Sequence, residues 1–217
     1  MNDGQLQSDL PDHWVPALKF TDHFIYTPSP LPKGLLVEIK DAYSRSEITE
    51  IAVGLGLFHG FSKMLIALGR EPDEMETTII PTPTAPTGLL NITAEKTNPI
   101  ASLLSATPNL RNRWLNLENS LWNMSSYPRN ELEKVRLRMA NLLRIDSKYI
   151  DSYDKNGSVA LTQNISDQFV FDIRSITSHQ RKIICNEFGT EGLLNLMLCL
   201  ALYDGIFRVA ATLDSWE

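Results

Sequence analysis

The chain has few cysteines, few histidines and no excess of positive charge, and each of these features excludes a class of protein. Two cysteines among 217 residues, Cys185 and Cys199, cannot build a disulfide framework or a four-thiolate metal site. Lys and Arg number 20 against 26 Asp and Glu, so the basic excess that a nucleic-acid-binding protein needs is missing. The four histidines show no metal-ligand spacing. We therefore expect no nucleic-acid partner, no metal and no other cofactor.

The first residues, MNDGQLQSDLPDHW, are polar and acidic and show no pattern of a secretory signal, so we expect a cytoplasmic protein. Two apolar runs, 51–69 and 193–213, are long enough to be compared with membrane spans. The first contains Lys63, and the second contains Asp204 and Arg208, which are costly in lipid. We therefore expect two buried helices of a soluble protein and no membrane partner.

Helical patterns fill most of the chain, and no run of alternating apolar and polar residues predicts a strand. Shorter helices are expected near residues 17–24, 34–42, 100–104, 110–124, 168–176 and 179–187. Ser44 and Glu47 have the spacing of a capping box and open a long apolar helix that ends at Gly69. Another helix follows Pro128, and the last long helix follows Gly189. The predicted fold class is therefore all-α.

A proline- and threonine-rich segment divides the chain into two helical parts. Residues 77–98 contain Pro81, Pro83 and Pro86, a composition typical of a stiff linker. We expect one helical part over 1–76 and a second over 99–217, packed together as one globular body.

The two longest predicted helices resemble each other at an offset of 145 residues. Residues 55–63, LGLFHGFSK, align with residues 200–208, LALYDGIFR. Gly60 and Gly205 fall in register, and a glycine inside a helix costs about 1 kcal/mol relative to alanine. We therefore expect close helix–helix approach at these glycines. A unit of helix, turn and long helix is predicted near 17–70 and again near 168–214. This pattern indicates an internal duplication.

Polar side chains also lie in register within these apolar helices. His59 and Lys63 are one turn apart in the first helix, as are Asp204 and Arg208 in the second. Polar groups inside an apolar helix need partners. They are either ion pairs between packed helices or the polar edge of a pocket, which Tyr203 would help to form.

The long helix, with an aromatic residue, a polar residue, three further residues and a basic residue before a final Ala-Leu-Gly, resembles the carboxymuconolactone decarboxylase family. This family includes the alkyl hydroperoxidase D-like proteins. Residues 17–23 and 43–48 are similar to the family's lead-in to that helix, and residues 67–72 to its exit. Residues 99–214 resemble a complete family unit, whereas the first part resembles only the later helices of one. The resemblance implies an alkyl hydroperoxidase D-like helical bundle and an obligate oligomer.

The redox centre that this resemblance implies is missing from the chain. The thiol-dependent branch of the family has a Cys-x-x-Cys motif followed by a histidine, where this chain has Ile145, Lys148 and Ser152. No cysteine or histidine occurs between residues 60 and 178, and a thiolate is the nucleophile of disulfide chemistry. Thiol peroxidase activity is therefore not expected.

The family's proton-relaying glutamate and its matching arginine correspond to Glu133 and Arg138. These residues form either a helix ion pair or a retained acid with a cationic substrate anchor. In the second case the protein is a cofactor-free lyase, decarboxylase or isomerase acting on a small organic acid or lactone. The proton-transfer candidates are then Glu133, His59 and Asp204, and the substrate-binding candidates are Arg138, Arg208 and Tyr203.

The alternative is a catalytically inactive structural or small-molecule-binding protein on the same scaffold. The missing thiols and the incomplete first unit favour this alternative. Under either hypothesis both long helices are apolar almost all round, which a small domain cannot bury alone. We therefore expect a homo-oligomer, most simply a dimer.

Overall fold

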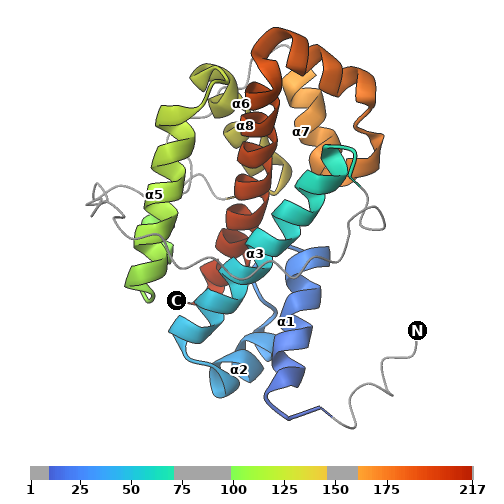
Figure 1. Ribbon diagram of the computed structural model, residues 1–217. Coiled ribbons are helices and arrows are strands. Elements are labelled where there is room, and N and C mark those ends of the chain that lie inside the picture. Colours follow the sequence, from blue (N-terminus) through green and yellow to red (C-terminus); the bar gives the residue numbers. More distant parts are fainter. Residues whose placement is uncertain (1–9, 71–98, 146–160, 217) are drawn as a thin grey trace.

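The computed structural model describes residues 10–70, 99–145 and 161–216, and every regular element in these ranges is helical (Figure 1). The all-α prediction is therefore confirmed. The helices are α1 (Trp14–Tyr26), α2 (Lys33–Ala42), α3 (Arg45–Ala67), α4 (Pro99–Leu103), α5 (Pro108–Met124), α6 (Arg129–Leu142), α7 (Leu161–Phe171) and α8 (Ser178–Leu213). The predicted linker, 77–98, lies outside the described residues, as do Lys148 and Ser152.

The predicted start and end of α3 are both observed. The Ser44 side chain accepts a hydrogen bond from the Glu47 backbone N–H, and a Glu47 carboxylate oxygen accepts the Ser44 N–H at 2.8 Å. At the other end Gly69 has a φ of 81°, and the Arg70 N–H donates to the Leu65 carbonyl at 2.9 Å. This is a Schellman closure, in which glycine adopts the left-handed conformation without steric cost.

A break within α8 occurs where the sequence predicts it. Gly189 has φ 74° and ψ 174°, so residues 178–188 and 190–213 form two helical segments joined by a kink. Thr177 and Gln180 form a second capping box at the start of the first segment, which was not predicted from the sequence.

The helix predicted near 168–176 is misplaced. The observed helix, α7, ends at Phe171, and a 3-10 turn at Ile173–Ser175 follows. Gln168 Nε2 donates to the Ser175 carbonyl at 3.0 Å and stabilises this turn. The early part of α7 contains polar residues, and for this reason its start was not predicted from the sequence. One of them, Ser166, donates its hydroxyl to the Thr162 carbonyl at 2.9 Å. A bond of this kind satisfies the hydroxyl within the helix.

α3 and α8 cross at the centre of the molecule with their backbones in contact (Figure 1). A Cβ atom on Gly56 would lie 2.9 Å from the Gly205 carbonyl oxygen, and one on Gly60 would overlap the Ala201 carbonyl oxygen. The predicted close approach at Gly60 and Gly205 is therefore observed, although the two glycines face different partners. Only glycine fits at positions 56 and 60.

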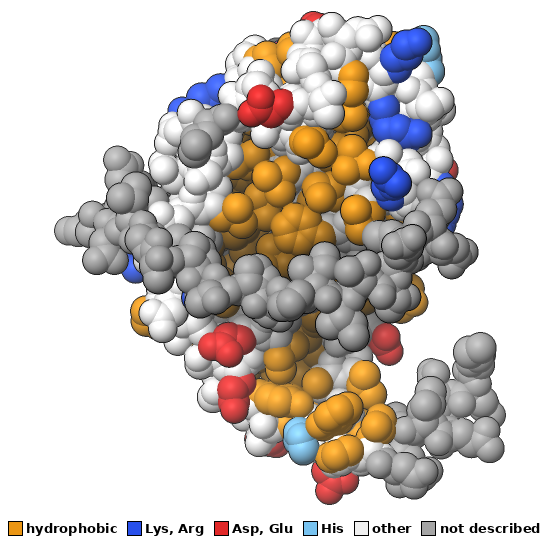
Figure 2. All heavy atoms as spheres, in the orientation of Figure 1, with side chains coloured by type: hydrophobic (Ala, Val, Ile, Leu, Met, Phe, Trp, Pro, Cys, Tyr) orange, Lys and Arg blue, Asp and Glu red, His pale blue; other side chains and the backbone are white. Residues whose placement is uncertain are grey.

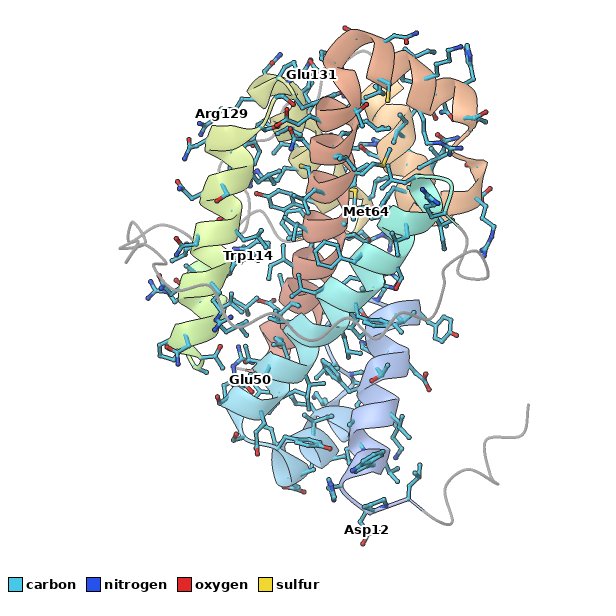
Figure 3. All side chains as sticks on the ribbon, viewed as in Figure 1. Asp12, Glu50, Met64, Trp114, Arg129 and Glu131 are labelled. Carbon is cyan, nitrogen blue, oxygen red and sulfur yellow. The ribbon has the colours of Figure 1, made fainter. Side chains whose placement is uncertain are left out.

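The burial of the two long helices differs from the prediction that both are buried. In the most apolar 18-residue stretch of α8, 89% of the residues are buried. In the corresponding stretch of α3, 28% of the residues are buried. α5 and α6 pack beside α8, with Trp114 of α5 pointing towards it (Figure 3). α3 is covered mainly on the side that faces α8. By length and composition alone, both helices could cross a membrane.

Candidate functional site

Asp204 is a fully buried carboxylate surrounded by three basic side chains at the α3–α8 crossing. Lys63 Nζ and His59 Nε2 lie 3.2 and 3.3 Å from Asp204 Oδ2, and Arg208 Nε lies 3.3 Å from Oδ1. The Lys63 and Arg208 contacts are hydrogen bonds. His59 Nε2 makes no hydrogen bond of regular geometry, although it lies close to Asp204 Oδ2.

The electrostatics of this cluster favour an ionised Asp204. Burial would raise the pKa of Asp204, but contact with His59, Lys63 and Arg208 outweighs burial and lowers the pKa to about 2. Burial also lowers the pKa of Lys63, an effect that Asp204 partly offsets and Arg208 reinforces. Because Asp204 stays ionised, it is not available as an acid near neutral pH.

The basic members of the cluster connect it to further helices. Arg208 Nη1 donates to the carbonyl oxygens of Phe24 and Ile25, at the end of α1, at 3.2 and 2.8 Å. Lys63 Nζ lies 4.8 Å from the ring centroid of Phe169 in α7. The cluster thus joins α1, α3, α7 and α8, a geometry that stabilises their packing.

Glu133 and Arg138 do not pair with each other. Glu133 accepts hydrogen bonds from Arg136 at 2.6 and 2.9 Å, and Arg138 donates to both carboxylate oxygens of Asp167 at 2.6 Å. Glu133 thus pairs within α6, whereas Asp204 pairs with His59 and Lys63 at the α3–α8 crossing.

Tyr203 lies in a separate polar contact with α5. Its hydroxyl donates to Glu118 at 2.9 Å and accepts from Trp122 Nε1 at 3.0 Å, while the ring packs against Trp114. Burial, with a contribution from Glu118, raises the pKa of Tyr203 well above its ordinary value. Tyr203 thus fixes α5 to α8 in the described structure.

Both cysteines are free thiols. Cys199 is fully buried, with its sulfur 3.9 Å from the Leu132 carbonyl oxygen, and burial raises its pKa far above the usual range. Cys185 is partly buried. In the described ranges, no group of three or more His, Cys, Asp or Glu side chains lies close enough together to hold a metal ion.

A pocket of about 860 Å³ borders Arg208. It is bounded by residues 25–30 at the end of α1 and just after it, by 142–145 at the end of α6, by the end of α7 and by the last turns of α8. The apolar lining residues are Ile25, Pro28, Pro30, Leu142, Leu143, Ile145, Val170, Phe171, Ala210 and Ala211. The charged lining residues are Arg144, Arg208 and Asp214. Of the six predicted site residues, Arg208 alone borders this pocket.

Arg144, at the rim of the pocket, was not identified from the sequence. It has a φ of 56° and occupies the position after the last helical residues of α6 where Gly69 stands after α3. Its N–H donates to Asn141, and the Ile145 N–H donates to Ala140, which is the same Schellman closure. A non-glycine residue here costs roughly 1 kcal/mol of strain, and position 144 itself carries no glycine or asparagine that would predict the closure.

Comparison with protein-family models, with curated proteins and with solved structures gives no significant match for this chain. Its function is therefore inferred from the residues and geometry of the chain itself.

Proposed function

We propose that this chain is a duplicated helical scaffold of the carboxymuconolactone decarboxylase type that binds an uncharged, mainly apolar small molecule and performs no acid–base catalysis. The observation that carries the proposal is the pocket of about 860 Å³ next to Arg208. Its volume is in the range of ligand sites, and its lining is mostly apolar with a few polar groups.

The position of the proton-transfer candidates supports binding over catalysis. Glu133, His59 and Asp204 are all absent from the pocket lining. General acid–base catalysis requires the catalytic group within hydrogen-bond distance of the substrate, directly or through one water. Asp204 is fully buried against its basic partners, and Glu133 is paired with Arg136.

The charge distribution around the pocket favours an uncharged ligand. α1, α6, α7 and α8 all end at the pocket, and each helix C-terminus carries a partial negative charge of about one half. Arg208 already contacts Asp204 and the carbonyl groups at the end of α1. Arg144 is exposed, so water screens its charge, and Asp214 adds a carboxylate. A ligand carboxylate is disfavoured, whereas a hydroxyl donor fits.

The duplication is supported by the helix bounds. Adding 145 to the bounds of α1, α2 and α3 gives 159–171, 178–187 and 190–212. The observed segments are 161–171 in α7 and, in α8, 178–188 and 190–213 on either side of Gly189. Phe20 and Phe24 align with Ile165 and Phe169, and all four side chains are fully buried.

The α3–α8 crossing supports the duplication independently. Gly56 faces Gly205, the counterpart of Gly60, and Gly60 faces Ala201, the counterpart of Gly56. Contacts that exchange in this way are those of two equivalent helices related by a twofold axis.

Nile red, an uncharged dye that fluoresces in apolar surroundings, tests the proposal. We expect saturable binding of one dye per chain and displacement by decanol at a concentration at least about tenfold lower than by decanoate. Ala211→Phe fills the pocket from α8 and should abolish binding. Leu194→Phe, on the exposed side of the same helix, is the matched control and should bind normally.

Two results would overturn the proposal. One is the absence of saturable dye binding by the folded wild-type chain. The other is equal binding by the Ala211→Phe and Leu194→Phe variants, because the dye would then occupy a different surface. Arg144→Gly tests the charge distribution separately. If decanoate displaces the dye better than decanol in the wild type but not in this variant, the ligand is an anion held by Arg144.

A further inference from the structure

The outer face of α3 is an apolar surface that no described helix covers. Phe58, at its centre, is 78% exposed. Ile51, Leu55, Phe61 and Leu65 lie on the same side of the helix at spacings of three and four residues and are partly exposed. Figure 2 shows hydrophobic side chains gathered on the side of the molecule where α3 crosses α8. We call this surface the α3 face.

The corresponding face of α8 is covered by another helix of the chain. In the proposed duplication Phe58 corresponds to Tyr203, which is buried under Trp114 and Trp122 of α5. The counterparts of Ile51 and the other apolar residues of the α3 face are likewise buried in α8. The face that α5 and its neighbours cover on α8 is thus not covered on α3 by any helix that the structure describes. This correspondence depends on the proposed duplication, whereas the symmetry, packing and charge of the α3 face do not.

The residues of the α3 face are arranged symmetrically about Phe58. If two copies of α3 pack antiparallel with Phe58 at the centre, residue i of one copy faces residue 116 − i of the other. The facing pairs are Ile51 with Leu65, Gly54 with Ser62, and Leu55 with Phe61. Large residues therefore face large ones and small residues face small ones. An isologous dimer, in which one surface packs against a second copy of itself, requires this kind of self-complementarity.

Gly54 adds a second reason for close helix packing at this face. Gly56 and Gly60 are required by the contact with α8, but a Cβ atom on Gly54 would meet nothing within 4 Å. A glycine inside a helix costs about 1 kcal/mol relative to alanine, and no contact with another described residue requires a glycine at position 54. Across an antiparallel pair, Gly54 would lie opposite Ser62 and leave room for the ring of Phe58.

Charge is also complementary in this arrangement. Glu47 and Glu50 lie at the start of α3, and Arg70 lies just beyond its end. In an antiparallel pair with this register, Glu47 of one copy faces residue 69 of the other and lies next to its Arg70. We propose that the α3 face is the interface of a homodimer, formed by two antiparallel copies of α3 with Phe58 on the twofold axis.

Sedimentation of the full chain over a range of concentrations tests the interface. We expect a particle of twice the 24.5 kDa chain mass, and we expect Phe58→Glu to weaken the dimer at least about 30-fold. Val37→Glu, at an exposed apolar position of α2, is the matched control and should leave the dimer intact. Because Phe58 and Val37 are both exposed, neither change should prevent folding.

Cross-linking tests the register. In a Cys185→Ser background, Ile51→Cys and Leu65→Cys should each give little disulfide-linked dimer alone. A mixture of the two variants should cross-link, because residue 51 of one copy faces residue 65 of the other.

A monomeric wild-type chain, or a dimer that survives Phe58→Glu, would overturn the proposal. Binding of the wild type to phosphatidylcholine vesicles, lost in Phe58→Glu and unaccompanied by a dimer in solution, would overturn it in favour of a membrane surface. Dye binding in the pocket is unaffected by Phe58→Glu if both proposals hold, so the two can fail separately.

Discussion

Replacing Asp204 by asparagine tests the buried cluster most directly. The side chain has no exposed surface, and its carboxylate is within 3.3 Å of three basic groups. Asparagine keeps the shape but leaves Lys63 and Arg208 buried without a counter-charge. Breaking a buried ion pair in this way costs about 3–5 kcal/mol. We therefore expect Asp204→Asn to lower the free energy of unfolding by that amount at pH 7.

Asp167→Asn is the matched control for this change. Asp167 accepts two hydrogen bonds of 2.6 Å from Arg138, a shorter contact than any at Asp204, but both side chains are about one-third exposed. Because exposed pairs contribute about 0–1 kcal/mol, Asp167→Asn should cost less than Asp204→Asn despite its better geometry. Urea unfolding followed by circular dichroism measures both. Equal losses would refute the reasoning that burial, and not hydrogen-bond length, decides the contribution.

The loss of stability at acid pH provides an independent measurement of what Asp204 contributes. The pKa of Asp204 is about 2 in the folded chain, against an ordinary value of 3.8. A carboxylate whose pKa is lowered by folding contributes stability above its unfolded pKa and loses it as the pH falls towards the folded value. The wild type should therefore lose about 2 kcal/mol between pH 4 and pH 2 that Asp204→Asn does not lose. Parallel acid profiles of the two chains would contradict this assignment.

Lys63→Met combined with Asp204→Asn should be more stable in urea than Asp204→Asn alone, because it removes one uncompensated buried cation. Gly60→Ala should destabilise the chain by at least about 2 kcal/mol in thermal unfolding, since the added methyl group overlaps the α8 backbone. Gly34→Ala, where the added carbon meets nothing within 4 Å, should instead stabilise it by up to about 1 kcal/mol. Tyr203→Phe should lower the urea midpoint by an amount corresponding to about 1–2 kcal/mol, because Trp122 Nε1 loses its hydrogen-bond acceptor.

Much of the helical architecture could be predicted because it depends on neighbours along the chain. The capping box at Ser44 and Glu47, the closure at Gly69 and the break at Gly189 are local signals, and all three are observed. The close approach at Gly60 could also be predicted, since a glycine inside a long apolar helix is favourable mainly where another backbone packs against it. The start of α7 could not be predicted, because polar residues such as Ser166 form hydrogen bonds within their own helix.

The sequence by itself determined the all-helical class of the fold, the ends of α3, the break at Gly189 and the presence of costly polar groups in two apolar segments. The tertiary structure alone decided which partners those groups have. Glu133 and Arg138 lie five residues apart in one helix, yet each pairs elsewhere, with Arg136 and with Asp167. Pairing depends on how each helix is rotated and on what packs beside it, which residues close in sequence do not specify. For the same reason the pocket beside Arg208, built from the ends of four helices distant in the chain, has no signature in any one segment.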